Sequence, residues 1–112
     1  MCREIGAKII LPVSSAENRE VFEFAKANIG TTGNSGFWLR ISDEYEEGKW
    51  RDSFDKSELI GFTHWGKGEP NNSRGGEHYG IMHTVIWQMW NGTGSWNDAQ
   101  GNDKQYIICE FQ

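Results

Sequence analysis

Oxygen-bearing side chains gather in two stretches of this chain, one beside Pro70 and one directly behind Trp96. These residues are Glu69, Asn71, Asn72, Glu77, Asn97 and Asp98. Carboxylate and amide oxygens, without sulfur donors, are the ligands that hard divalent cations prefer, calcium above all. The same side chains could also exchange hydrogen bonds with a hydroxylated ligand. Either chemistry requires the two stretches to meet in space.

Taken singly, each of these residues has an ordinary structural explanation. Glu69 and Glu77 could be solvated loop acids, while Asn71 and Asn97 are common turn residues. The case for a calcium site therefore depends on the whole set rather than on any one member.

The composition narrows the function classes. A chain of 112 residues can form one domain with a hydrophobic core but not two. Fourteen glycines with two prolines indicate a turn-rich domain. No apolar run approaches the roughly 18–20 residues that span a bilayer, so we expect no membrane insertion. The net charge of −5 and the scattering of the eleven basic residues argue against nucleic-acid binding.

Two cysteines, Cys2 and Cys109, stand at opposite ends of the chain. They could be free thiols of an intracellular protein. A disulfide between them would instead close a loop of about a hundred residues and contribute roughly 4–5 kcal/mol in the chain-entropy model. We expect the disulfide, which favours a secreted or extracellular protein. The N-terminal residues lack a signal-peptide pattern, so any leader has been removed or lies outside this sequence.

One helix is predicted with defined ends. Ser14 and Glu17 form a capping box, and Gly30 supplies a stop, which predicts a helix over residues 16–29. Apolar side chains recur at helical spacing within it, and we expect this stripe to face the core. The stripe consists of Val21, Phe24, Ala25 and Ile29.

The rest of the chain predicts short strands and long loops. Apolar and aromatic runs indicate strands at residues 37–41, 79–85, 86–90, 95–96 and 105–111. Residues 66–76 are nearly all turn formers and predict a long ordered loop, a feature that is usually functional in a compact domain. A helix followed by short strands indicates a single α+β domain over residues 1–112.

The order of these features resembles the C-type lectin domain, over nearly the whole chain. The matching features are Cys2, the capped helix, Trp38-Leu39-Arg40-Ile41, Trp65, Glu69-Pro70-Asn71, Trp96-Asn97-Asp98 and Cys109-Glu110. The strand motif departs from the family's Trp-Ile-Gly-Leu at Arg40, where glycine is usual. The resemblance implies a C-type lectin-like fold, with one or two helices on short antiparallel strands and a long calcium-binding loop.

The resemblance also implies a binding site. Its principal calcium ligands would be Glu69, Asn71, Glu77, Asn97 and Asp98. The Glu69–Pro70 peptide would be cis, as X–Pro bonds in tight turns can be. Two vicinal sugar hydroxyls would complete the coordination, bonded to Glu69, Asn71, Glu77 and Asn97. The Glu-Pro-Asn order is associated in the family with mannose-type sugars, including fucose and N-acetylglucosamine, rather than galactose.

This chain departs from the family pattern near that site. Asp43, Glu47 and Asn72 match an auxiliary calcium site, but neutral Asn72 and His78 stand where further acids are common. Since imidazole is a poor calcium ligand, we expect this second site to be weak or empty. An inner disulfide is also missing, so we expect the loop to depend on calcium for its order.

Two further features leave alternatives open. Trp87 and Trp90 could stack on a sugar face, or they could belong to the core. A first strand and helix usually precede the counterpart of Cys2, and here they do not. The edge formed by residues 106–111 would then be exposed, or filled by a partner chain.

The combined prediction is a calcium-dependent, non-enzymatic domain that binds glycans of the mannose, fucose and N-acetylglucosamine type. Single-site affinity should be weak, about 1 mM, so useful avidity would require a homo-oligomer. The alternative is a protein-binding or ice-binding module that retains calcium. An enzyme is disfavoured because His64, His78 and His83 lack a zinc-like spacing with cysteine, and no Gly-Xaa-Ser-Xaa-Gly motif occurs.

Overall fold

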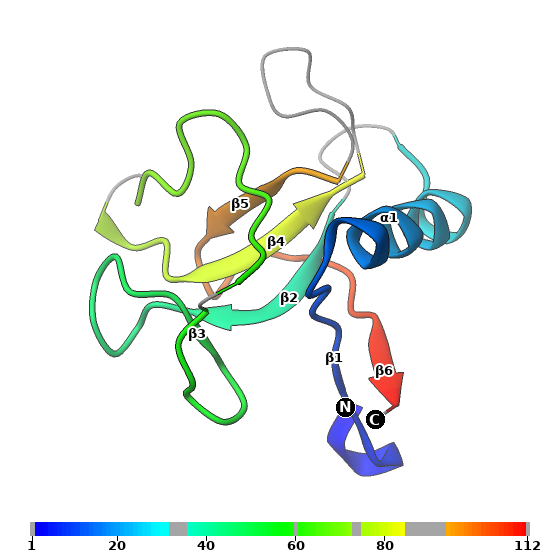
Figure 1. Cartoon of the computed structure of the whole chain (residues 1–112), viewed down its shortest axis with the longest axis horizontal. Helices are drawn as coiled ribbons and strands as arrows, with labels where there is room; N and C mark the ends of the chain where they lie inside the picture. Colours follow the sequence, from blue (N-terminus) through cyan, green and yellow to red (C-terminus); the bar gives the residue numbers. More distant parts are fainter. Residues whose placement is uncertain (1, 32–35, 60, 73–74, 85–93, 112) are drawn as a thin grey trace.

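The structure is a computed structural model that describes residues 2–31, 36–59, 61–72, 75–84 and 94–111. Helical and extended segments pack into an α+β domain, which confirms the predicted class (Figure 1). In chain order the elements are η1 (Cys2–Ile5), β1 (Ala7–Ile9), α1 (Ser15–Ile29), β2 (Gly36–Ser42), β3 (Arg51–Asp52), β4 (Tyr79–His83), β5 (Trp96–Ala99) and β6 (Cys109–Phe111). No described helix has the length and apolarity needed to cross a membrane.

The strands form two antiparallel sheets. The larger sheet has the order β3-β2-β4-β5, and the smaller one pairs β1 with β6. Within the larger sheet, Trp38 lies opposite Ile81 and Gly80 lies opposite Asp98. The first and last strands of the chain therefore lie side by side, with both chain ends together at the bottom of Figure 1.

Helix α1 has the predicted ends. The Ser14 hydroxyl accepts a hydrogen bond from the Glu17 backbone N–H at 3.1 Å, and the Gly30 N–H donates to the Lys26 carbonyl at 3.2 Å. Both bonds satisfy backbone groups that a helix leaves without partners at its ends. The sequence could locate them because each cap is made by residues only three or four positions away.

The predicted core face of α1 was partly wrong. Phe24 is 55% exposed, whereas Phe22 is 2% exposed and polar Asn18 is buried beside it. Asn18 accepts a hydrogen bond from the Trp96 indole N–H at 2.8 Å and donates to the Gly94 carbonyl at 3.1 Å. Because Trp96 and Gly94, both distant in sequence, satisfy the Asn18 amide, this polar residue can face the core, and an apolar pattern alone misses that face.

The core lies between α1 and the larger sheet. Phe22 and Ala25 from the helix belong to one buried cluster with Phe37, Met82 and Trp96 from the strands. Trp65 meets the Trp96 ring edge-on at a centroid distance of 5.8 Å. This packing anchors β5, the last strand of the larger sheet, to the core through the fully buried Trp96.

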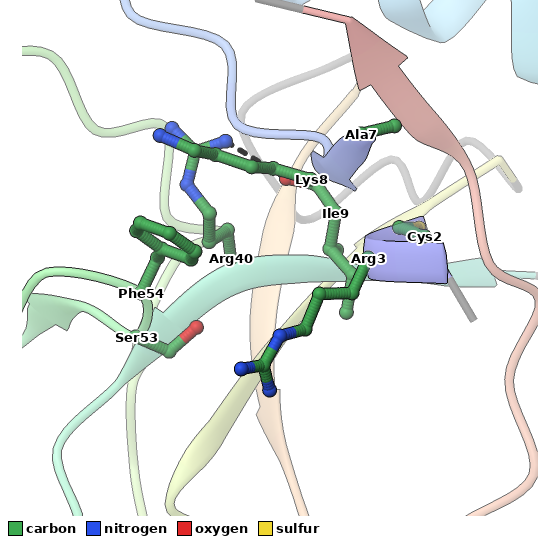
Figure 2. Close-up of a pocket in the computed structure, with 8 residues that line it drawn as sticks. All are labelled: Cys2, Arg3, Ala7, Lys8, Ile9, Arg40, Ser53 and Phe54. Carbon is green, nitrogen blue, oxygen red and sulfur yellow. Dashed lines mark hydrogen bonds between the residues drawn. The ribbon is translucent and has the colours of Figure 1, made fainter. Parts of the chain in front are cut away.

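Arg40, the departure from the family's usual glycine, joins four strands. From β2 its guanidinium bonds Asp52 at 3.1 Å, Glu110 at 3.0 Å and the Ile9 carbonyl at 3.0 Å. Figure 2 shows this side chain beside β1. The Arg40 side chain is only 11% exposed, and charge-assisted hydrogen bonds to two carboxylates satisfy its guanidinium.

The Cys2–Cys109 disulfide is confirmed, with the two Cα atoms 5.5 Å apart. It closes the pairing in which Ile9 lies opposite Cys109. The edge formed by residues 106–111 was expected to be exposed or filled by a partner chain. Instead, β1 of the same chain pairs with β6 along residues 109–111. The side chains of Tyr106, Ile107 and Phe111 are nevertheless exposed.

Replacing Gly80 with alanine should destabilise the domain by about 1–3 kcal/mol, the usual cost of overpacking a core. A Cβ atom at Gly80 would collide with Cδ1 and Cγ1 of Ile41, which is buried in the core. Urea unfolding measures the change. The matched control is Gly61→Ala, where an added Cβ meets no atom within 4 Å. Equal losses in both variants would contradict this packing.

Candidate functional site

Strand β5 holds the start of the long loop. The Trp96 N–H donates to the His64 carbonyl at 2.8 Å, and the Trp96 carbonyl accepts from the Gly66 N–H at 2.9 Å. These two bonds form a parallel bridge between Trp65 and Trp96. The loop therefore leaves the core directly beside the strand that carries Asn97 and Asp98.

Asp98 then holds the middle of the same loop. One of its oxygens accepts a hydrogen bond from the Asn71 N–H at 3.2 Å, and the other accepts from the Asn72 N–H at 2.6 Å. Bonds to a charged group contribute about 1.5–3 kcal/mol each, and this side chain is almost fully buried. The Glu69–Pro70 peptide that precedes these amides is cis, as the resemblance implies. The two predicted stretches thus meet in space.

Three acids of the predicted set lie within one another's electrostatic field. The pKa of Glu69 is raised from its ordinary value of 4.5 to about 7, chiefly by desolvation, then by a side-chain hydrogen bond with Asp98 and by the charges of Asp98 and Glu77. Like charges at close range disfavour the ionised form of the Glu69 carboxyl. A cation among them would remove this repulsion.

Two side-chain oxygens of the set are buried without a hydrogen-bond partner among the described residues. They are Oε1 of Glu69 and Oδ1 of Asn97. A buried polar atom left unsatisfied costs about 1–3 kcal/mol. Since both atoms are hard oxygen donors beside further acids, the residues present fit a calcium ion.

A cavity of about 370 Å³ opens on this side of the sheet. Glu77, Asn97 and Asp98 line it, together with His83 and Lys104. The sequence did not single out His83 as a member of this site, although its Nε2 atom lies 3.4 Å from Nδ2 of Asn97. The strand register is what places His83 in this site. Ile81 lies opposite Asn97, and His83 follows Ile81 by two residues on the same face of β4. The register is known only from the pairing of β4 with β5 in the folded structure.

The auxiliary acids form a second cluster, and histidine joins it. The His78 Nδ1 atom lies 3.0 Å from Oδ1 of Asp43 and 3.3 Å from Oε1 of Glu47. Desolvation, and then the Asp43 carboxylate, raise the pKa of Glu47. Asn72, the third residue predicted for this position, uses its side-chain oxygen to accept the Glu77 N–H at 2.9 Å.

Trp87 and Trp90 lie outside the described residues. A separate pocket of about 250 Å³ lies beside the disulfide and β1, and Figure 2 shows Arg3, Lys8 and Arg40 around it. It contains none of the predicted calcium ligands, and its cationic lining is unsuited to a metal ion.

Comparison with known sequences gives a consistent result. A sequence model of the family described as Lectin C-type domain matches residues 1–111. Collectin-43 of Bos taurus is 29% identical over 99% of this chain and 31% of its own length. Hepatic lectin of Gallus gallus is 30% identical over 97% of this chain and 45% of its own length. The chain thus spans less than half of each relative.

Comparison with solved structures finds the same family of folds. The C-type lectin CEL-I from Cucumaria echinata matches with a TM-score of 0.75 and 25% identity, covering 92% of this chain and 66% of that one. The expected C-type lectin-like fold, with one α-helix on antiparallel sheets among the described residues, is confirmed.

In the calcium-free domain, the Glu69 carboxyl should titrate near pH 7. Glu77→Gln removes a like charge and should lower that pKa toward 4.5. Carboxyl ¹³C NMR measures both values. Glu20→Gln, on the exposed face of α1, is the matched control and should leave the Glu69 pKa unchanged.

The same shift predicts how stability depends on pH. An acid with a raised pKa binds its proton more tightly in the folded state, so this group makes the calcium-free domain lose stability as pH rises from 4.5 to about 7. Urea unfolding of the wild type and of Glu69→Gln isolates the effect, because the variant lacks the titrating group. A wild type that gains stability relative to the variant across this interval would refute the shift.

Proposed function

The chain belongs to the C-type lectin family, and from that premise we propose that it binds mannose-type carbohydrate through one calcium ion. The proposed protein ligands are Glu69, Asn71, Glu77, Asn97 and Asp98. The domain would be non-enzymatic and extracellular, in keeping with the disulfide that joins its two ends.

The observation that carries this proposal is a pair of buried oxygens that have no hydrogen-bond partner in the part of the chain that the structure describes. Oε1 of Glu69 belongs to the long loop, and Oδ1 of Asn97 belongs to β5. Both are oxygens that calcium accepts as ligands. The cluster of Glu69, Glu77 and Asp98 supports it further. Desolvation first, and then the neighbouring acids Asp98 and Glu77, raise the pKa of Glu69, and a bound cation would offset the repulsion among the three acids.

The order of acid and amide supports the sugar class. Glu69 precedes the proline as an acceptor, and the Asn71 amide follows it as a possible donor. A sugar hydroxyl that ligates the ion can donate to such an acid and accept from such an amide. When bound, calcium supplies the charge that fixes the hydroxyl oxygens, while these side chains select their orientation.

Few contacts hold such a ligand, so affinity should be weak. A dissociation constant of about 1 mM corresponds to about 4 kcal/mol. We propose that several copies act together on a glycan surface, since linked weak sites multiply affinity when they engage at once.

A protein-binding function is the second candidate, and one observation favours it. Phe24 and Tyr106 are each more than half exposed, and they border an apolar pocket with Ile107 between α1 and the C-terminal segment. Large exposed apolar patches often mark protein contacts. A glycan array without calcium-dependent binding, on a folded calcium-bound domain, would support this candidate.

Mannose binding should disappear on chelation and return with added calcium. A mannose column eluted with EDTA, and then reloaded with calcium, tests this directly. The binding should also weaken as pH falls below about 7, since protons compete with calcium at Glu69. Retention on the column that chelator leaves unchanged would overturn the proposal.

The double variant Glu69→Gln with Asn71→Asp should exchange the sugar preference. It moves the acid from one side of Pro70 to the other and keeps the net charge, so calcium binding should persist while the donor and acceptor positions swap. Competition by mannose, fucose and galactose measures the preference. A variant that binds calcium but still prefers mannose over galactose would contradict the assigned roles of these two residues.

A further inference from the structure

We propose that Asp43, Glu47 and His78 form a binding site for a transition-metal ion of the Zn²⁺ class, separate from the proposed calcium ligands. Asp43 and Glu47 belong to the turn that follows β2, and His78 directly precedes β4. One ligand atom from each residue lies within 4.8 Å of the other two.

The distances fit a coordination sphere. Zinc bonds of roughly 2.0–2.2 Å place adjacent ligand atoms about 3.0–3.5 Å apart in tetrahedral or octahedral geometry. The His78 Nδ1 atom lies 3.0 Å from the Asp43 oxygen and 3.3 Å from the Glu47 oxygen. A single N–H at Nδ1 points at one acceptor, whereas a metal ion can be shared by both carboxylates and the imidazole.

Two of the three ligands are already held in position. The Asp43 N–H donates to the His78 carbonyl at 3.1 Å, which ties the two backbones together. The second oxygen of Asp43 accepts the Gly48 N–H at 2.9 Å, and this leaves Oδ1 directed at the histidine. Asp43 is 2% exposed, so its carboxylate cannot turn freely toward solvent.

The proposed zinc site is accessible to solvent on the side of Glu47 and His78. The Glu47 side chain is 53% exposed and the His78 side chain is 32% exposed, so an ion can enter from solvent and keep water in its remaining positions. Two carboxylates and a neutral imidazole together carry a charge of about −2, which matches a divalent cation.

The histidine decides which cation fits. Calcium takes hard oxygen ligands, whereas imidazole suits zinc, copper, iron and nickel. With His78 in the set, the cluster offers one borderline nitrogen and two oxygens. This donor set favours a transition metal over a second calcium ion.

Zinc titration of the calcium-saturated full chain, followed by calorimetry, tests the proposal. We expect one equivalent of Zn²⁺ to bind, His78→Gln to weaken it at least tenfold, and Glu47→Gln, an exposed and structurally mild change, to weaken it severalfold. The matched control is His64→Gln, because His64 stacks on Phe62 outside the cluster. Co²⁺ absorption should show the same dependence on His78.

A direct probe identifies the ligand atom. The ¹⁵N NMR resonance of Nδ1 in His78 should shift when zinc is added. The same shift should persist in Glu69→Gln, because Glu69 belongs to the proposed calcium site and not to the zinc site. Absence of zinc binding in excess calcium, equal weakening in His78→Gln and His64→Gln, or loss in Glu69→Gln would each overturn the proposal. No sugar enters these measurements, so their failure is distinguishable from failure of the proposed lectin function.

His78→Asp provides the reciprocal test. The change makes the donor set all oxygen, so zinc affinity should fall at least tenfold while a second calcium equivalent becomes detectable. Zinc affinity equal to that of the wild type would show that the imidazole is not a ligand.

Discussion

The candidate calcium site depends on the buried carboxylate of Asp98. Its two oxygens accept the backbone N–H groups of Asn71 and Asn72, so a loop without regular structure is held against a strand. The strand is itself held by its pairing with Gly80 on β4. Without this carboxylate, the two N–H groups would lose their partner and the loop its fixed distance from Asn97.

The same short strand serves the core and the candidate site. At its first residue, Trp96 is buried against Trp65 and is anchored by the Asn18 amide on α1. Two residues later, Asp98 contributes to the field that raises the pKa of Glu69, and to a lesser degree that of Glu47. The two acidic clusters are thus electrostatic neighbours, and a cation at one reduces the repulsion felt at the other.

Much of the fold could be predicted because its signals are local or lie at the chain ends. Ser14 and Gly30 cap α1 through residues three or four positions away, and the strand around Trp38 is recognisable from its own residues. The buried face of α1 was partly missed, since Asn18 looks like a surface residue until its partners, Trp96 on β5 and Gly94 just before that strand, are known. The role of Arg40 was missed for the same reason. Its three contacts come from β1, β3 and β6, and no local sequence pattern connects these strands.

The sequence by itself determined the donor types of the site, the proline between Glu69 and Asn71, and the cysteines that join the two ends. These depend on the chemistry of each residue and on its order along the chain. Only the tertiary structure decided that the partly buried Glu69 lies beside Asp98, that two buried oxygens lack hydrogen-bond partners among the described residues, and that His78 faces Asp43. The reason is that burial and electrostatic fields are created by groups distant in sequence, which meet only when strands pair and the core packs.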